Sequence, residues 1–188
     1  MPGIKIIYWK NEVSMFAYII LGSALLGQFK DPYGLKNSKK TQYAHEVILQ
    51  AKDNNINPSE AIAIVLTESG FNPKAYSRTK DVGLFQVNCK WWYKKFKYKN
   101  IKTCERDLLN PSKNIKAGLY ILKYFRSNFK QCRGNLAYRC YNGGQGWYKS
   151  KNKNKIINYS KSVLRRKAKV EQHYKIFIQY YGRSYANG

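Results

Sequence analysis

The stretch Pro58-Ser-Glu-Ala-Ile-Ala-Ile-Val-Leu-Thr-Glu-Ser-Gly70 decides how this chain folds. Pro58 suits the first position of a helix, where its missing N–H group costs no hydrogen bond, and Asn57 before it is a candidate N-cap. Residues 61–66 are apolar on every side, which is typical of a helix that is buried all round. Gly70 suits the left-handed conformation that commonly ends a helix. The stretch therefore predicts a short, fully buried helix.

A carboxyl group lies at the end of this predicted helix, at Glu68. Burial disfavours the charged form of a carboxyl group and raises its pKa. The C-terminal end of a helix carries partial negative charge, which acts in the same direction. A carboxyl group that keeps its proton near neutral pH is what general acid catalysis requires. Glu68 is therefore a candidate catalytic acid, and a solvated glutamate at a helix end is the alternative.

The rest of the chain reads as mostly helical, around a region rich in turn residues. Residues 30–40 are polar and indicate a linker, and residues 71–90 indicate a loop or small hairpin. Helical spacing of apolar residues predicts further helices in segments 41–53, 110–125, 136–141 and 155–167, and again in the tail around 170–181.

Five segments resemble, in order, the motifs of the lytic transglycosylase (SLT) domain family. They are Glu68-Ser-Gly-Phe-Asn-Pro-Lys-Ala75, Gly83-Leu-Phe-Gln-Val-Asn88, Asn110-Pro-Ser-Lys-Asn-Ile-Lys-Ala-Gly118, Tyr141-Asn-Gly-Gly144 and Tyr159-Ser-Lys-Ser-Val163. The fourth departs from the family pattern, since Cys140 and Gly143 stand where the family has alanine. The resemblance covers roughly residues 41–165.

This resemblance implies a mostly α, lysozyme-like fold (α+β lysozyme superfamily) with a substrate cleft and a minor loop or hairpin region. It implies cleavage of the β-1,4 bond between N-acetylmuramic acid and N-acetylglucosamine in peptidoglycan, with 1,6-anhydro ends and no cofactor. Glu68 would protonate the glycosidic oxygen and then act as base on the 6-hydroxyl group of the same sugar.

The resemblance also implies roles for residues around Glu68. Gln86 and Asn88 would line the floor of the cleft and bind amide or hydroxyl groups of the sugars. Tyr141 would hydrogen-bond near the acid and hold its orientation, with Asn142 beside it as a further substrate-binding residue. Ser69 would support the fold or the carboxyl group.

A hydrolase on the same fold is the alternative activity. Asp81 precedes Val82-Gly-Leu-Phe-Gln-Val-Asn88, and with Trp91 and Trp92 this segment resembles the animal c-type lysozyme pattern. A second carboxylate in the cleft would allow a water-dependent reaction. The plainer interpretation of Asp81 is an aspartate that caps a loop. The two tryptophans fit either stacking on sugar rings or packing inside the protein.

The net charge of +25, from 35 basic and 10 acidic residues, demands an anionic environment. Peptidoglycan strands, an anionic cell wall or a membrane surface provide one. A basic module that binds the wall or nucleic acid without catalysis is a further alternative. Nucleic acid is disfavoured, because the sequence has no recognisable nucleic-acid-binding signature.

Four cysteines are present, at positions 89, 104, 132 and 140. They form no CxxC pair and lie far from both histidines, so the sequence predicts no metal site. Four cysteines allow two disulfides in three connectivities, of which Cys89–Cys104 with Cys132–Cys140 has the shortest loops. Four free thiols in a reducing compartment are the alternative.

The expected organisation has three parts. Residues 1–40 form an N-terminal segment plus linker, in which the uncharged residues 13–29 indicate an export signal or short anchor. Residues 41–165 form the catalytic domain, and residues 166–188 a basic amphipathic extension. We expect a location in the cell envelope, periplasmic or extracellular, or in a phage particle, with a secretion system or phage assembly as a candidate partner.

Overall fold

The protein is mostly α-helical, as the sequence predicted. The structure, a computed structural model, describes residues 38–186, with side chains described for residues 39–173. Its helices are α2 (Ser38–Asp53), α3 (Pro58–Glu68), α4 (Cys89–Trp92), α5 (Ile101–Asp107), α6 (Pro111–Asn128), α7 (Ala137–Gly143) and α8 (Lys153–Ala186). Short 3-10 helices cover Lys130–Cys132, Gly134–Leu136 and Trp147–Lys149, and two strands, β1 (Asp81–Val82) and β2 (Val87–Asn88), pair in antiparallel fashion.

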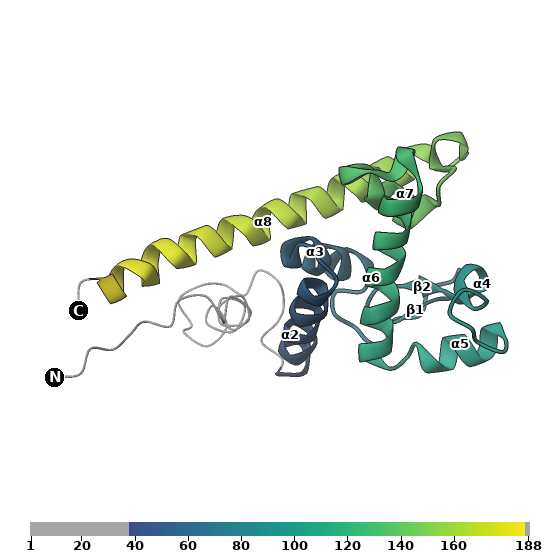
Figure 1. Ribbon diagram of the computed structural model, residues 1–188, viewed down its shortest axis with the longest axis horizontal. Coiled ribbons are helices and arrows are strands. Elements are labelled where there is room, and N and C mark those ends of the chain that lie inside the picture. Colours follow the sequence, from purple (N-terminus) through teal and green to yellow (C-terminus); the bar gives the residue numbers. More distant parts are fainter. Residues whose placement is uncertain (1–37, 187–188) are drawn as a thin grey trace.

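Helix α3 lies at the centre of the core and packs against α2 and α8 (Figure 1). Residues 59–66 are all buried, as expected for a helix that is apolar on every side. Its start is the predicted one, because the side chain of Asn57 accepts a hydrogen bond from the backbone N–H of Ser59 at 2.8 Å. The helix ends at Glu68, and Gly70 follows with φ of 56°.

A buried ion pair joins α3 to α6. The carboxylate of Glu60 is 4% exposed and accepts hydrogen bonds from both terminal nitrogens of Arg126, with Nη1 to Oε2 at 3.2 Å. A buried carboxylate is tolerated because this guanidinium group satisfies both of its oxygens. The pair fixes the end of α6 against the start of the helix that carries Glu68.

The β1–β2 hairpin lies beside α6 (Figure 1), and a buried asparagine of α6 attaches the two elements. The side chain of Asn114 donates to the carbonyls of Val82 and Leu108, at 2.7 and 3.0 Å, and accepts from the N–H of Phe85 at 2.8 Å. Gly118 lets the two elements approach, since a Cβ atom there would lie 2.2 Å from the Phe85 ring. The small hairpin predicted within residues 71–90 is thus held on the same helix that lines the cleft.

Helix α8 is one continuous helix where the sequence pattern predicted two segments. No glycine or proline interrupts residues 153–181, so nothing in the backbone ends the helix near residue 167. Ile156, Val163 and Val170 are buried at a spacing of seven residues, which places them on one face. The domain boundary expected between residues 165 and 166 falls inside this helix.

The structure contains both short-loop disulfides, Cys89–Cys104 and Cys132–Cys140. The first joins α4 to α5, and the second joins the 3-10 helix at residues 130–132 to α7. Helix α2 begins at Ser38, inside the segment expected to be linker, while the expected signal or anchor at 13–29 lies outside the described residues. None of the helices between residues 38 and 186 has the length and apolar character needed to cross a membrane.

Candidate active site

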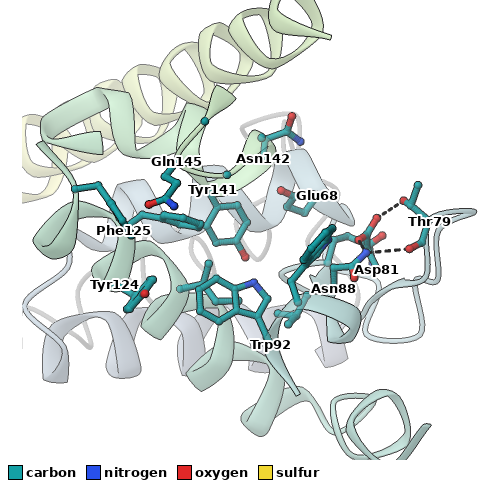
Figure 2. A pocket seen from close by; sticks show the side chains of 18 residues that line it. Glu68, Thr79, Asp81, Asn88, Trp92, Tyr124, Phe125, Tyr141, Asn142 and Gln145 are labelled. Carbon is teal, nitrogen blue, oxygen red and sulfur yellow. Dashed lines mark hydrogen bonds between the residues drawn. The ribbon is translucent and has the colours of Figure 1, made fainter. Parts of the chain in front are cut away.

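A cleft of about 750 Å³ opens between the hairpin and α7. Its walls come from the end of α3, the β1–β2 hairpin, α4, the second half of α6, and the start of the glycine-rich loop after α7. In Figure 2 Glu68 enters this cleft from one side, with Trp92 on the opposite side and Asp81 and Asn88 beyond one end. Segments far apart in the sequence therefore meet around one carboxyl group.

Glu68 has the protonation expected of a general acid. Its pKa is raised from an ordinary value of 4.5 to about 8, chiefly because burial removes water from the charged form. A hydrogen bond from Tyr159 acts against this shift, and the negative charge of Asp81 adds to it. Desolvation dominates, so the carboxyl group carries a proton at neutral pH.

Tyr159 is a site residue that the sequence analysis did not identify. Its hydroxyl group donates a hydrogen bond to Oε1 of Glu68 at 2.5 Å, from α8 to the end of α3. The proton of the acid therefore belongs on the other oxygen, Oε2. Burial raises the pKa of Tyr159 well above its ordinary value, and the neighbouring Glu68 adds to this effect, so the phenol stays a donor. The closing motif at residues 159–163 was the available signal.

Tyr141 has a different contact from the expected one. Its hydroxyl group donates to the backbone carbonyl of Phe85 at 2.7 Å and so supports the turn of the hairpin. It lies close enough to Glu68 and Asp81 for their charges to add to burial in raising its pKa. The hydrogen bond that orients the acid comes from Tyr159, because α8 and not α7 brings a phenol to Oε1.

Ser69 and Gln86 both hold the backbone of the hairpin turn. The hydroxyl group of Ser69 donates to the carbonyl of Leu84 at 2.8 Å, which ties the residue after the acid to the hairpin. The amide nitrogen of Gln86 donates to the carbonyls of Gly83 and Ala75, at 2.9 and 3.1 Å, while the residue itself lines the cleft with φ of 46°. Ser69 thus supports the fold beside the carboxyl group.

Asp81 lines the cleft, but its carboxylate is engaged on both oxygens. Oδ2 accepts hydrogen bonds from the hydroxyl groups of Ser77, at 2.6 Å, and Thr79. Oδ1 accepts from the side-chain amide of Asn88 at 2.7 Å (Figure 2). These bonds tie together the two strands and the loop before them, which is the loop-capping arrangement. Asn88 also caps α4 by accepting from the backbone N–H of Lys90.

Aromatic rings form the wall of the cleft opposite Glu68. Trp92 packs edge-on against Tyr124 and Phe125, with ring centroids 5.4 and 5.7 Å apart, and all three line the cleft. Trp91, also a lining residue, is 73% exposed. Each tryptophan therefore fits one of the two expectations. Trp92 packs in an aromatic cluster, and Trp91 presents its ring to solvent. Asn142 is exposed along the cleft edge beside Glu68.

Comparison with known proteins gives matches at the level of family and fold. The family model described as the transglycosylase SLT domain matches residues 46–162. A solved structure of the 70 kDa soluble lytic transglycosylase of Escherichia coli matches with a TM-score of 0.53 and 21% identity, which establishes a shared fold. The match covers 87% of this chain and 30% of that protein, so the chain spans under a third of its length. No curated protein matches by sequence.

The described residues offer no metal site. Between residues 38 and 186 there is no group of three histidine, cysteine or acidic side chains placed to hold an ion. The arrangement in the cleft is one of a proton donor, its tyrosine partner, hairpin backbone and aromatic rings. These groups are suited to acid–base chemistry.

Proposed function

This chain belongs to the transglycosylase SLT domain family, and we propose that it is a peptidoglycan lytic transglycosylase with Glu68 as its catalytic acid. The observation that carries the proposal is the partly buried carboxyl group of Glu68, which lines the cleft, accepts a hydrogen bond from Tyr159 and has its pKa raised to about 8. The substrate is the β-1,4 bond between N-acetylmuramic acid and N-acetylglucosamine. The aromatic wall at Trp92 gives the sugar rings an apolar surface to pack on.

In the first step the proton of Glu68 passes to the bridging glycosidic oxygen as the bond to the muramic acid carbon breaks. The raised pKa supports this step because it keeps the carboxyl group protonated at neutral pH, so that the proton is present when the substrate binds. The hydrogen bond from Tyr159 to Oε1 keeps Oε2 as the donating atom and stabilises the carboxylate that forms.

In the second step the carboxylate of Glu68 takes the proton of the 6-hydroxyl group of the same muramic acid. The 6-oxygen closes on the anomeric carbon, which gives a 1,6-anhydro end and returns Glu68 to its protonated form. No water molecule is consumed, and the positive charge at the anomeric carbon is stabilised by the N-acetyl group of the substrate. One carboxyl group is therefore sufficient.

A muramidase that uses Asp81 is the second candidate, since this carboxylate lines the same cleft. Hydrogen bonds from Ser77, Thr79 and Asn88 favour a structural role for it instead. These three bonds occupy most of the lone pairs with which the carboxylate would contact a water molecule or the sugar. These contacts support the transglycosylase over the hydrolase.

Digestion of purified peptidoglycan followed by mass analysis of the muropeptides tests the proposal. We expect 1,6-anhydro ends from the wild type and from Asp81→Asn, and no products from Glu68→Gln, whose amide cannot donate an acid proton. Reducing muramic acid ends, lost in Asp81→Asn, would instead establish the hydrolase. Unchanged turnover in Glu68→Gln would place the active site elsewhere.

For the setting, we infer an oxidising compartment of the cell envelope in which the enzyme meets an anionic wall. Two disulfides are stable in such a compartment, and the net charge of +25 favours wall carboxylates and phosphates. Binding to isolated walls should weaken as salt rises. Retention unchanged at high salt would contradict binding by charge.

A secretion machine or a phage particle is the assembly we propose for this setting, with residues 13–29 as an export signal or membrane anchor. Their uncharged, apolar sequence supports that role. Fractionation of the producing cells and of any released particles distinguishes the two assemblies. Recovery from the cytosol with reduced cysteines would contradict both.

A further inference from the structure

Two lysine side chains lie over aromatic rings that line the cleft. The Nζ atom of Lys90 is 5.4 Å from the centre of the Trp91 ring, and that of Lys95 is 5.2 Å from the centre of the Tyr124 ring. Both rings belong to the cleft wall. A cation over a ring face is attracted by the ring electrons, so these contacts hold two otherwise flexible ammonium groups next to rings that line the cleft.

The segment that carries the two lysines is strongly basic. Residues 90–102 contain six lysines, all of them exposed, and residues 90–104 contain no acidic residue. Asp81, the acidic residue of the hairpin, lines the same cleft, and its carboxylate accepts hydrogen bonds from the neutral side chains of Ser77, Thr79 and Asn88. Lys90 and Lys95, which we call the lysine rim, therefore lie in a segment that has no carboxylate of its own.

The sugar backbone of peptidoglycan gives these ammonium groups no charge to bind. Its rings carry hydroxyl and acetamido groups, and the lactyl carboxyl group of each muramic acid is used up in the amide bond to the peptide stem. Free carboxylates are found on the stems, which project from the muramic acids next to the scissile bonds. The charges of the two ammonium groups are therefore complementary to the peptide stems of the substrate and not to its sugar backbone.

We propose that the lysine rim binds carboxylates of the peptide stems, so that this enzyme prefers peptide-bearing glycan strands over bare strands. The inference rests on the proposed function, since it assigns the part of the substrate next to the cleaved bond. Exposed charge pairs are individually weak and screened by salt, so the preference is a matter of several-fold and falls at high ionic strength.

Kinetics on two matched substrates test the rim. The ratio of kcat/KM for peptide-bearing strands to kcat/KM for amidase-stripped strands is measured for wild type, Lys90→Gln/Lys95→Gln and Lys99→Gln/Lys102→Gln. The strands are freed of phosphate polymers beforehand. We expect the first double variant to lower this ratio by about three- to tenfold. Lys99 and Lys102 are exposed lysines of the same segment, and their variant loses the same net charge.

The control variant should leave the ratio at the wild-type value, because it removes charge away from the cleft-lining rings. Equal ratios in all three proteins would overturn the proposal. An equal fall of the ratio in both double variants would also overturn it, because it would indicate an effect of net charge alone. Peptide-bearing strands with chemically amidated carboxyl groups should behave as stripped strands. A preference that survives amidation would also overturn it, since the stem would then be bound by its shape.

A binding measurement separates this inference from the proposed function. Glu68→Gln protein, with and without the Lys90→Gln/Lys95→Gln pair, is pelleted with insoluble walls before and after amidase treatment. If the wild type cleaves neither substrate, the proposed function fails, while loss of stem-dependent pelleting in the lysine variant still supports the rim. Pelleting that ignores the stems would overturn the rim even in an active enzyme.

Discussion

The surroundings of Glu68 both keep its carboxyl group protonated and determine which of its oxygens carries the proton. Its position at the end of a buried helix removes water from the carboxyl group, and the contact with Tyr159 fixes which oxygen keeps the proton. Sequence reasoning found the first property, because burial follows from the apolar run before the residue. It missed the second, because Tyr159 is 91 residues away and no local pattern pairs the two side chains.

The pH dependence of turnover follows from the raised pKa of Glu68. The reactive form is protonated, so kcat/KM should be level below about pH 8 and fall tenfold per pH unit above it. Initial rates on soluble glycan strands measure this profile. A decline that begins near pH 4.5, the ordinary pKa of a glutamate, would contradict the protonated acid.

The stability of the protein should respond to the same ionisation. Between about pH 4.5 and about pH 8 the carboxyl group is ionised in the unfolded chain but protonated in the folded one. The folded state then binds more protons, so wild-type stability falls as the pH rises through this window. Urea unfolding of wild type and Glu68→Gln should show the variant gaining relative stability up to about pH 8. A difference that is constant with pH would argue against the shift.

Tyr159→Phe tests the role of the hydrogen bond to the acid. That bond lowers the pKa of Glu68, so its loss should move the alkaline limb of the pH profile to higher pH and reduce kcat about tenfold. Tyr141→Phe is the matched control, because its hydroxyl group bonds to the carbonyl of Phe85. Equal displacement of the limb in both variants would mean that Tyr159 has no specific effect on the acid.

The hairpin and α6 form the element-scale unit of the site, and Asn114 joins them. Asn114→Ala leaves the buried N–H of Phe85 and the carbonyls of Val82 and Leu108 without this partner, which should cost about 3 kcal/mol or more. Asn110→Ala is a matched control that removes only an exposed helix cap, at about 1 kcal/mol. Denaturant unfolding measures the loss of stability in both variants. Equal losses would contradict the role of Asn114 in joining the hairpin to α6.

Element prediction from the sequence succeeded where a local signal exists. Pro58 and Pro111 each begin a helix, and the asparagine before each proline caps it, which the sequence predicted for Asn57. The sequence pattern predicted two helices in place of α8, because the many basic residues of this segment make its continuous apolar stripe hard to recognise. The short helix α4 was not predicted, because its 4 residues make only about one turn, which is too short to show a periodicity. Its form depends on Asn88 and the Cys89–Cys104 disulfide.

At the scale of the whole molecule, the two disulfides brace opposite walls of the cleft. Cys89 lies two residues before Trp91, and Cys140 directly precedes Tyr141. A closed loop of about 15 residues stabilises a fold by about 3 kcal/mol through the unfolded chain. We expect reduction of both bonds to lower the midpoint of thermal unfolding clearly and to impair turnover. An unchanged midpoint, with alkylation confirming free thiols, would show that the fold does not depend on them.

The source of the oxygen at the new chain end tests the central claim most directly. Peptidoglycan is digested in water enriched in ¹⁸O, and the muramic acid ends are examined by mass spectrometry. Closure of the ring by the sugar's own 6-hydroxyl group, with Glu68 alone moving the proton, predicts anhydro ends that carry no ¹⁸O. Reducing ends that carry one ¹⁸O atom would show that water attacked the anomeric carbon, and would contradict this mechanism.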